Sequence, residues 1–196
     1  KDNWWGPAGQ TGPCGPDSEM FYWTGDSEAP AVYDPEDNRW VEIWNDVFMQ
    51  YNKQEDGSFV PLEQQNVDTG MGLERVVAVL NGKKTPFDTE LFREIIEEIH
   101  LLSGVSEPNE AQIKAERIVA DHLRTATFII GDPCGVTPSN TDQGYILRRL
   151  IRRAIRYGRE LGIEVDFVRK IAGIVVKNYS GYYTELAEAQ EKIYEE

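Results

Sequence analysis

The sequence predicts an α+β fold in which a sheet comes first and helices follow. Residues 3–40 are rich in glycine, proline, aspartate and aromatic residues, a composition typical of loops and short strands. Residues 40–52 place apolar side chains at mostly alternating positions, which indicates a long strand. From residue 73 onward, apolar residues recur at helical spacing. Candidate boundaries between the two parts lie near residues 82–86 and 104–109.

Composition restricts the class of protein. The 196 residues are 40% hydrophobic and 11% aromatic, and they include two cysteines, which excludes a disordered tail, a collagen-like repeat and a disulfide scaffold. The sequence contains no apolar run of about 20 residues and no opening signal peptide, so we expect a cytoplasmic globular protein that does not enter a membrane. Because the first residue is lysine, we expect the sequence to be part of a longer protein.

Turn signals separate the elements of the first half. Asp56-Gly57 predicts a hairpin turn between the strand at 40–52 and a short strand over Phe59–Leu62. The segment Val67–Gly72 then leads into a helix over Leu73–Leu80, which ends near Asn81-Gly82.

Capping signals predict the helices of the second half. Thr85, Pro86 and Asp88 form a typical helix start, and we expect this helix to continue to about Leu102 and to end at Gly104. A further helix begins at Asn109 and passes through residues 111–130. We expect the remaining elements to be a loop over 131–141, a helix over 145–161 and a helical stretch over 167–196.

Charge is distributed unevenly along the chain. The formal net charge is −14, and residues 1–100 contain 20 acidic against 7 basic residues, whereas residues 101–196 contain 14 against 13. Six arginines lie between Arg148 and Arg159, and at helical spacing all six fall within about 140° of arc. Two interpretations stay open: a solvated face paired with carboxylates, or a face that contacts an RNA or DNA backbone.

The segment DTGMGLER, residues 68–75, is a second candidate site. Its two glycines allow a ligand to approach the backbone, and the helix start behind them offers free N–H donors. Arg75 follows in the first turn, from which an arginine can reach a phosphate or stack on a base. The segment lacks the third glycine of a dinucleotide-binding fingerprint and the Gly-Lys-Ser/Thr of a P-loop. By itself it is a weak signal.

The aromatic segment 3–16 and the isolated cysteine and histidines are less specific. The tryptophans at the start of the chain either wall a ligand pocket or fill the core. Cys14 has no second cysteine or histidine at metal-ligand spacing, so we expect no zinc site. His100 and His122 lie in helical patterns without a nearby nucleophile, and we interpret both as structural.

Five stretches taken together closely resemble the alanyl-tRNA synthetase family, and they occur in that family's order over nearly the whole chain. They are NWWGPAGQTGPCGPDSEMF (3–21), EIWNDVFMQYN (42–52), VDTGMGLERVVAVL (67–80), ADHLRTATFIIGD (120–132) and PSNTDQGYILRRLIRRAIRYG (138–158). Each stretch alone is ambiguous, whereas five in order are specific.

The resemblance implies a class II synthetase fold, with part of an antiparallel sheet in residues 1–104 and an all-helical unit in residues 105–196. The first part corresponds to the C-terminal half of the catalytic domain and the second to the start of the tRNA-recognition domain. The family activates alanine with ATP and Mg²⁺ to alanyl-adenylate and transfers the alanyl group to tRNA(Ala). The implied partners are therefore alanine, ATP and the acceptor stem of this tRNA, and not DNA.

The resemblance also assigns site residues, all of which position substrates and none of which acts as a catalytic nucleophile or base. The residues that correspond to amino-acid contacts are Trp5, Asn45, Asp68 and Gly70, with Asp68 matching the acid that pairs with the substrate ammonium. Those that correspond to ATP contacts are Gly72, Arg75 and Glu42.

The implied tRNA contacts lie in the second half. Asn140 matches the region in which the family reads a G·U wobble pair of the acceptor stem, where an amide can bond exposed base edges. Arginines would hold the phosphates. The arginines concerned are Arg148, Arg149, Arg152, Arg153 and Arg156.

The sequence also departs from the family pattern. Gln143 replaces a usual arginine, the loop 131–137 is longer by about two residues, and Asp17 stands where many members have a second cysteine. Motifs 1 and 2 and the zinc-binding editing domain have no counterpart in these residues, so we expect the chain alone not to aminoacylate. The alternatives are a non-catalytic RNA-binding or regulatory module derived from a synthetase, and an acidic structural domain whose arginines form internal ion pairs.

Overall fold

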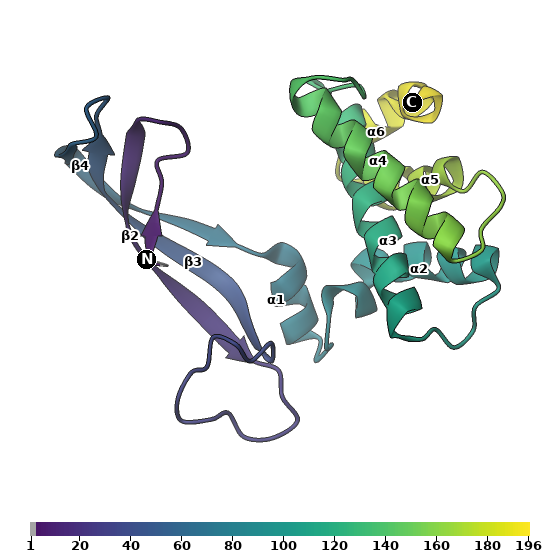
Figure 1. Cartoon of the computed structure of the whole chain (residues 1–196), viewed down its shortest axis with the longest axis horizontal. Coiled ribbons are helices and arrows are strands. Elements are labelled where there is room, and N and C mark those ends of the chain that lie inside the picture. The colour runs from purple at the N-terminus through teal and green to yellow at the C-terminus, as the bar shows by residue number, and fades with distance from the viewer. Residues whose placement is uncertain (1–2) are drawn as a thin grey trace. The chain divides into compact units, whose positions relative to one another are not determined.

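In the computed structural model, which describes residues 3–196, the strands come first along the chain and the helices follow, so the predicted α+β class is confirmed (Figure 1). The chain divides into two compact units, Lys1–Thr89 and Glu90–Glu196. This division by packing assigns the helix after residue 89 to the second unit. The boundary at 104/105, which separates the two domains implied by the resemblance, stays a prediction.

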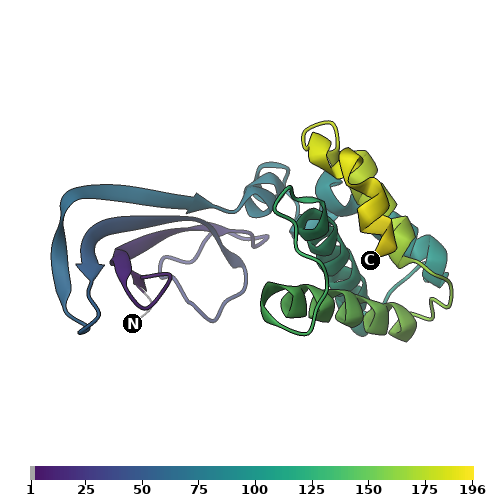
Figure 2. The same ribbon diagram turned by 90° about the horizontal axis from the view of Figure 1, so that it is seen from above.

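The first unit is built on a four-stranded antiparallel sheet in the order β1-β2-β3-β4. The sheet bends along its length, as Figure 2 shows. Its strands are β1 (Trp4–Trp5), β2 (Gly12–Trp23), β3 (Trp40–Lys53) and β4 (Phe59–Met71).

Strand β2 is longer than the loops and short strands that we expected over residues 3–40. Gly15 and Pro16 are accommodated because the pairing of β2 with β3 is interrupted between Cys14 and Asp17, whereas Gly12 and Pro13 lie opposite Lys53 and Asn52. At this break, Gly15 and Pro16 pair with β1 instead. A proline cannot donate to a strand ladder, so a break in the ladder is where a strand tolerates one. Gly15 is required by space, because a Cβ there would lie 1.9 Å from the carbonyl oxygen of Phe48.

Strand β4 is also longer than predicted, since it continues past Leu62 to Met71. Pro61 lies in it beside a shift in register between Met49 and Tyr51. Within the described sheet β4 is an edge strand, a position in which proline is tolerated. The predicted start of this hairpin is confirmed: Gly57 has a φ of 83°, and the Asp56 side chain accepts a hydrogen bond from the Ser58 N–H at 2.9 Å.

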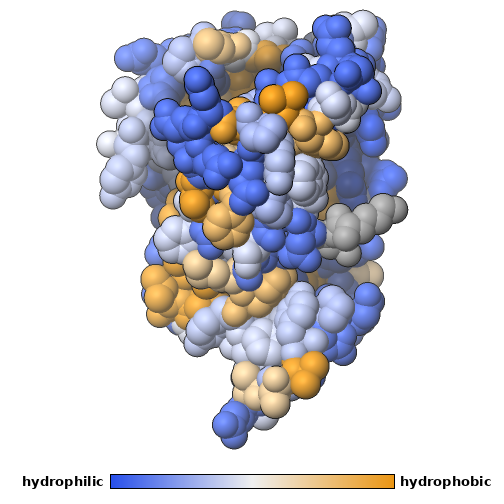
Figure 3. Space-filling view, turned by 90° about the vertical axis from the view of Figure 1, so that its left-hand side faces the viewer, coloured by the Kyte–Doolittle hydropathy of each residue, from blue (hydrophilic) through white to orange (hydrophobic). Residues whose placement is uncertain are grey.

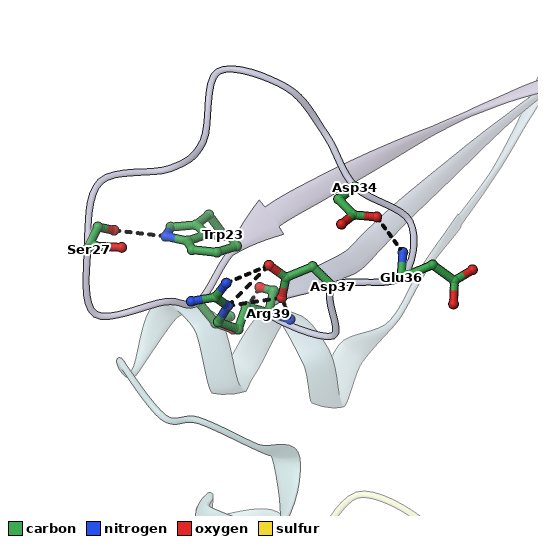
Figure 4. A network of polar contacts seen from close by, with 7 residues as sticks. Trp23, Ser27, Asp34, Glu36, Asp37 and Arg39 are labelled. Atoms are coloured by element: carbon green, nitrogen blue, oxygen red, sulfur yellow. Dashed lines mark hydrogen bonds and ion pairs between the residues drawn. The ribbon is translucent and has the colours of Figure 1, made fainter.

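The β2–β3 connection is held by a local polar network (Figure 4). The guanidinium of Arg39 donates to the Asp37 carboxylate at 2.7 Å and lies 4.5 Å from the centre of the Trp23 ring. The Trp23 indole N–H donates to the Ser27 carbonyl at 2.8 Å. The hydrogen bonds from Arg39 hold the pKa of Asp37 below its ordinary value, because they favour the ionised carboxylate.

Helix α1 (Leu73–Leu80) follows the sheet and confirms the predicted helix there. The single helix expected from Thr85 to Leu102 is wrong, because the structure divides it into a 3₁₀ turn, η1 (Pro86–Asp88), and helix α2 (Glu90–Ser103). Thr89 lies between them with extended backbone, φ −91° and ψ 166°. The capping contacts of Thr85 with Asp88 thus close one short turn, and the Thr89 hydroxyl donates to the Pro86 carbonyl.

The second unit is helical. After α2 come α3 (Glu110–Gly131), α4 (Asp142–Glu160), α5 (Val168–Tyr179), α6 (Thr184–Glu188) and α7 (Gln190–Glu195). The predicted start of α3 is confirmed, because Asn109 and Gln112 exchange the two hydrogen bonds of a capping box, each at 3.0 Å.

The core of the helical unit is formed around α3, which packs against α2, α4, α5, α6 and α7. Its buried side chains include Ala126, Ile130, Leu147, Ala172, Val176, Leu186 and Ile193. The chain therefore buries the apolar face of α4 against α3 and leaves the opposite face of α4 to the solvent.

We predict that Gly15→Ala destabilises the sheet unit by about 1–3 kcal/mol, because the added methyl group overlaps the Phe48 carbonyl. Thermal unfolding followed by tryptophan fluorescence measures the effect. Gly70→Ala is the matched control, since a Cβ at Gly70 meets no atom within 4 Å. Equal melting temperatures for the two variants would contradict the packing described here.

Candidate functional site

Strand register places several of the predicted amino-acid contacts on one face of the sheet. Asn45 lies opposite Gly70, and Val47 lies opposite Asp68. Residues directly opposite each other in an antiparallel pair point to the same face, as do residues two apart on one strand. Asn45, Asp68 and Gly70 therefore share a face to which strands β3 and β4 both contribute.

A cavity of about 600 Å³ adjoins this face. Trp5 and Asp68, which lie 63 positions apart in the sequence, both line the cavity, together with Met49, Leu62 and Asn66. The structure thus brings Trp5 and Asp68 together as predicted. Asn45 and Gly70 lie one residue pair further along the same sheet face and are not among the residues that line this cavity.

The two tryptophans of β1 make different contacts, and both are partly exposed. Trp4 stacks on Tyr51 with ring centroids 5.9 Å apart and meets the edge of Phe59 at 5.5 Å. Trp5, the next residue along the strand, lines the cavity and is 39% exposed. Successive residues of a strand point to opposite faces, so Trp4 contacts the aromatic rings while Trp5 lines the cavity.

Glycines keep the ligand side of β4 open. A Cβ at Gly70 would meet no atom within 4 Å, so this position leaves free space on the face that Asn45 and Asp68 share. Gly72 begins helix α1, and its N–H donates to the Ile43 carbonyl at 3.1 Å. That bond joins the helix start to β3.

The three predicted ATP contacts also lie together. Arg75, in the first turn of α1, donates through one guanidinium nitrogen to the Glu42 carbonyl at 2.9 Å and to the Glu42 carboxylate at 3.1 Å. The Arg75 side chain is half exposed, which leaves its remaining N–H donors accessible. Gly72 lies beside the same side chain, and a Cβ there would lie 3.2 Å from the Arg75 Cδ.

Sequence reasoning missed one contact in this site. The Asp17 carboxylate on β2 lies 3.2 Å from the Asn45 side-chain nitrogen. Asp17 is opposite Val47, so it occupies the same face as Asn45 and Asp68. The sequence contained one signal for this contact, because Asp17 departs from the family pattern. Its partner could not be predicted, because it depends on the register between β2 and β3.

The second candidate site is the arginine face of α4, which is defined by Arg148, Arg149, Arg152, Arg153, Arg156 and Arg159. A groove of about 1030 Å³ runs beside this face, and five of the six arginines line it together with His122 and Glu160. Within residues 3–196, the ion pair on this face joins Arg156 and Glu160 at 3.4 Å, and both side chains are exposed. Internal ion pairing therefore accounts for little of the arginine face.

Aromatic rings and an amide support these guanidinium groups. Arg156 lies 4.6 Å from the centre of the Tyr157 ring, and Arg149 lies 5.7 Å from that of Tyr145. Arg148 donates a hydrogen bond to the side-chain oxygen of Asn140. The structure thus joins the predicted base-reading amide to the start of the arginine face.

The two histidines each face a carboxylate. The His100 Nε2 lies 3.1 Å from Glu116, and the His122 Nδ1 lies 2.9 Å from Asp121. In the part of the chain that the structure describes, no group of three or more His, Cys, Asp or Glu side chains is arranged to hold a metal ion. No helix formed by these residues is both long and apolar enough to cross a membrane.

The exposed surface of the sheet unit is chemically mixed. Figure 3 shows hydrophobic side chains interspersed among hydrophilic ones on the side that it presents. Large apolar side chains that are exposed in this unit include Val60, Val67, Met71 and Leu73.

Comparison of the sequence with known proteins shows the family of the chain. The whole chain, residues 1–196, matches the family described as tRNA synthetases class II (A). The chain is 53% identical over 191 residues to the alanine–tRNA ligase of Treponema denticola and 52% identical over 190 residues to that of Treponema pallidum. It is 45% identical over 197 residues to the alanine–tRNA ligase of Borreliella afzelii.

These alignments cover 96%, 95% and 99% of this chain but 32%, 31% and 33% of the respective relatives. The chain therefore spans about a third of the length of these relatives. A match over all of its residues nevertheless shows the family. The chain belongs to the class II (A) family of tRNA synthetases.

Proposed function

We propose that this chain provides the amino-acid pocket, part of the ATP site and an acceptor-stem contact of an alanine–tRNA ligase. The observation that carries the proposal is the strand register that sets Asn45, Asp68 and Gly70 on one sheet face, beside the cavity lined by Trp5. The names of the relatives support alanine as the amino acid.

In the proposed amino-acid site, the α-ammonium of alanine donates to the exposed Asp68 carboxylate. A hydrogen bond in which both groups are charged is worth about 1.5–3 kcal/mol, so Asp68 supplies a large part of the affinity. Gly70 leaves room for the backbone of the substrate, and Trp5 closes one side of the cavity. Such a pocket rejects larger side chains by steric overlap but discriminates weakly against glycine.

In the proposed ATP site, Arg75 contacts the phosphates or the adenine ring of ATP, which binds as its Mg²⁺ complex. Glu42 holds one guanidinium nitrogen in place while the others face outward. Mg²⁺ on a nucleotide is bound mainly by phosphates and water, with one or two carboxylates from the protein, and Glu42 is the carboxylate at this position. The residues present thus fit the nucleotide as substrate.

The proposed reaction has two steps, and positioning governs both. The alanine carboxylate attacks the α-phosphorus of ATP, the bond to the β-phosphate oxygen breaks, and pyrophosphate leaves with alanyl-adenylate formed. A hydroxyl of the tRNA 3′-terminal ribose then attacks the alanyl carbonyl and releases AMP. Asp68 and Arg75 hold the two reactants in line, and Arg75 stabilises charge on the phosphates.

The arginine face is proposed to bind the acceptor stem of tRNA(Ala). Guanidinium groups bind phosphates in a fork geometry. Few carboxylates of the described chain compete with phosphates for the guanidinium groups of this face. Asn140 lies at the start of the arginine face through its contact with Arg148, where its amide would read a base edge at the G·U pair. Phosphate contacts set the orientation, and the amide supplies specificity.

We predict that Asp68→Asn weakens binding of a non-hydrolysable alanyl-adenylate analogue by about 10- to 100-fold, because the charged partner of the ammonium is lost. Isothermal titration calorimetry of the 196-residue chain measures the effect. Asp46→Asn is the matched control: it removes a carboxylate from β3 opposite Thr69, on the other face of the sheet. Equal affinities for the two variants would contradict the proposed pocket.

We also predict that the double variant Arg152→Ala and Arg153→Ala reduces affinity for an acceptor-stem RNA hairpin. The slope of log K against log salt concentration should fall by about 1–2, because up to two phosphate contacts are removed. Fluorescence anisotropy over a salt series measures both quantities.

Arg93→Ala is the control for the RNA measurement, since Arg93 is exposed on α2 and does not line the groove. An unchanged salt slope in the double variant would contradict the RNA contact and favour a purely structural arginine face. Binding of RNA without binding of the adenylate analogue would instead favour a non-catalytic RNA-binding module.

A further inference from the structure

Asp17 and Asn45 form a polar pair on the ligand face of the sheet. Their strands place them diagonally across the β2–β3 ladder, where Asp17 lies opposite Val47 and Glu19 lies opposite Asn45. The Asn45 Nδ2 donates to the Asp17 Oδ2 at 3.2 Å, and both residues are partly buried. This contact joins a residue that the family resemblance assigns to the pocket with one that it does not assign.

The chemistry of the pair determines which way the Asn45 amide faces. An ionised carboxylate accepts hydrogen bonds and cannot donate them, whereas an amide has one donating and one accepting end. The donating nitrogen of Asn45 must therefore face Asp17. As a consequence, the accepting oxygen of Asn45 faces away from Asp17.

Two oxygens of this pair have no hydrogen-bond partner within residues 3–196. The Asn45 Oδ1 and the Asp17 Oδ1 are both buried from solvent and unpaired. Buried acceptors of this kind are normally satisfied, and these two lie on the sheet face that also carries Asp68, so they point to a ligand that donates. The diagonal spacing of neighbouring strands sets Asn45 and Asp68 about 7–8 Å apart at the backbone, close enough for an ammonium to lie between the side chains.

We propose that Asp17 is a positioning residue, which orients the Asn45 amide so that its oxygen accepts a hydrogen bond from the substrate ammonium bound by Asp68. The inference rests on the proposed amino-acid pocket. Asp17 acts through Asn45, and its negative charge adds to the field that attracts a cation.

The orientation of Asn45 is tested without ligand. In the free chain, the side-chain amide resonances of Asn45 should show one hydrogen-bonded proton, and Asp17→Ala should remove that signature. Asp17→Asn should retain it, because the asparagine oxygen still accepts. Two-dimensional ¹H–¹⁵N spectra of the Asn side chains measure this. An Asn45 amide pair that does not change in Asp17→Ala would overturn the inference, whatever ligands the chain binds.

The effect on the substrate is tested with two analogues, an alanyl-adenylate mimic and the same compound without its α-amino group. Asp17→Ala should weaken the first by about tenfold, as is typical when a group that orients a ligand is removed, and should leave the second unchanged. Asp17→Asn should restore most of the loss. Asp46→Ala, on the opposite face of β3, should affect neither.

The outcomes separate this inference from the proposed function. If the unaltered chain binds neither analogue, the proposed pocket fails, and the amide spectra still decide whether Asp17 orients Asn45. If Asp17→Ala weakens both analogues equally, Asp17 is merely structural and the inference is overturned. Selective loss for the amino-bearing analogue, with rescue by Asp17→Asn, supports it.

Discussion

The site depends on the antiparallel register between β3 and β4. Side chains alternate along a strand, so a shift of one residue would turn Asp68 and Gly70 to the face opposite Asn45. The register is set at both ends of the hairpin. At the turn, Gln54 and Ser58 are joined by a backbone hydrogen bond of 2.8 Å, and at the far end Gly72 bonds Ile43 at 3.1 Å. Between Trp44 and Met49 the pairing with residues 66–71 of β4 is continuous, and the shift in register lies nearer the turn, between Met49 and Tyr51.

Strand pairing also determines which side chain lies next to Asn45. Because β2 pairs with β3 in turn, Asp17 is brought beside Asn45, and one acceptor oxygen of each lacks a hydrogen-bond partner within residues 3–196. A buried acceptor without a donor costs stability, and proteins tolerate such a cost mainly where a ligand removes it. In the proposed site, a donating ligand would give these oxygens the partners that they lack in the described chain.

Local signals in the sequence predict part of this structure. The capping residues at Asn109, the alternation in β3 and the arginine face of α4 depend on neighbours a few positions away, and the structure confirms them. The length of β2, the division of the helix after Thr85 and the contact of Asp17 depend on pairing with distant strands or on packing. Asp17 and Asn45 are 28 positions apart and come into contact because of the register between their strands. Composition and periodicity do not predict this register.

The distribution of charge is compatible with the proposed RNA contact of an acidic chain. The net charge of −14 repels a nucleic acid at long range, whereas the six arginines of α4 form a local positive surface with one weak internal ion pair among the described residues. Screening by salt removes long-range repulsion within about 10 Å at 0.1 M, so the local surface dominates at contact. The proposed sheet site thus depends on strand register, whereas the arginine face depends on local charge.

The shared face of β3 and β4 is proposed to bind an activated amino acid. Mapping of backbone and indole ¹H–¹⁵N shifts on addition of a non-hydrolysable alanyl-adenylate analogue tests this binding. We expect saturable shifts that concentrate at Asn45, Asp68, Gly70 and the Trp5 indole, and much smaller ones with a valyl analogue. Shifts confined to other surfaces, or equal responses to both analogues, would contradict it.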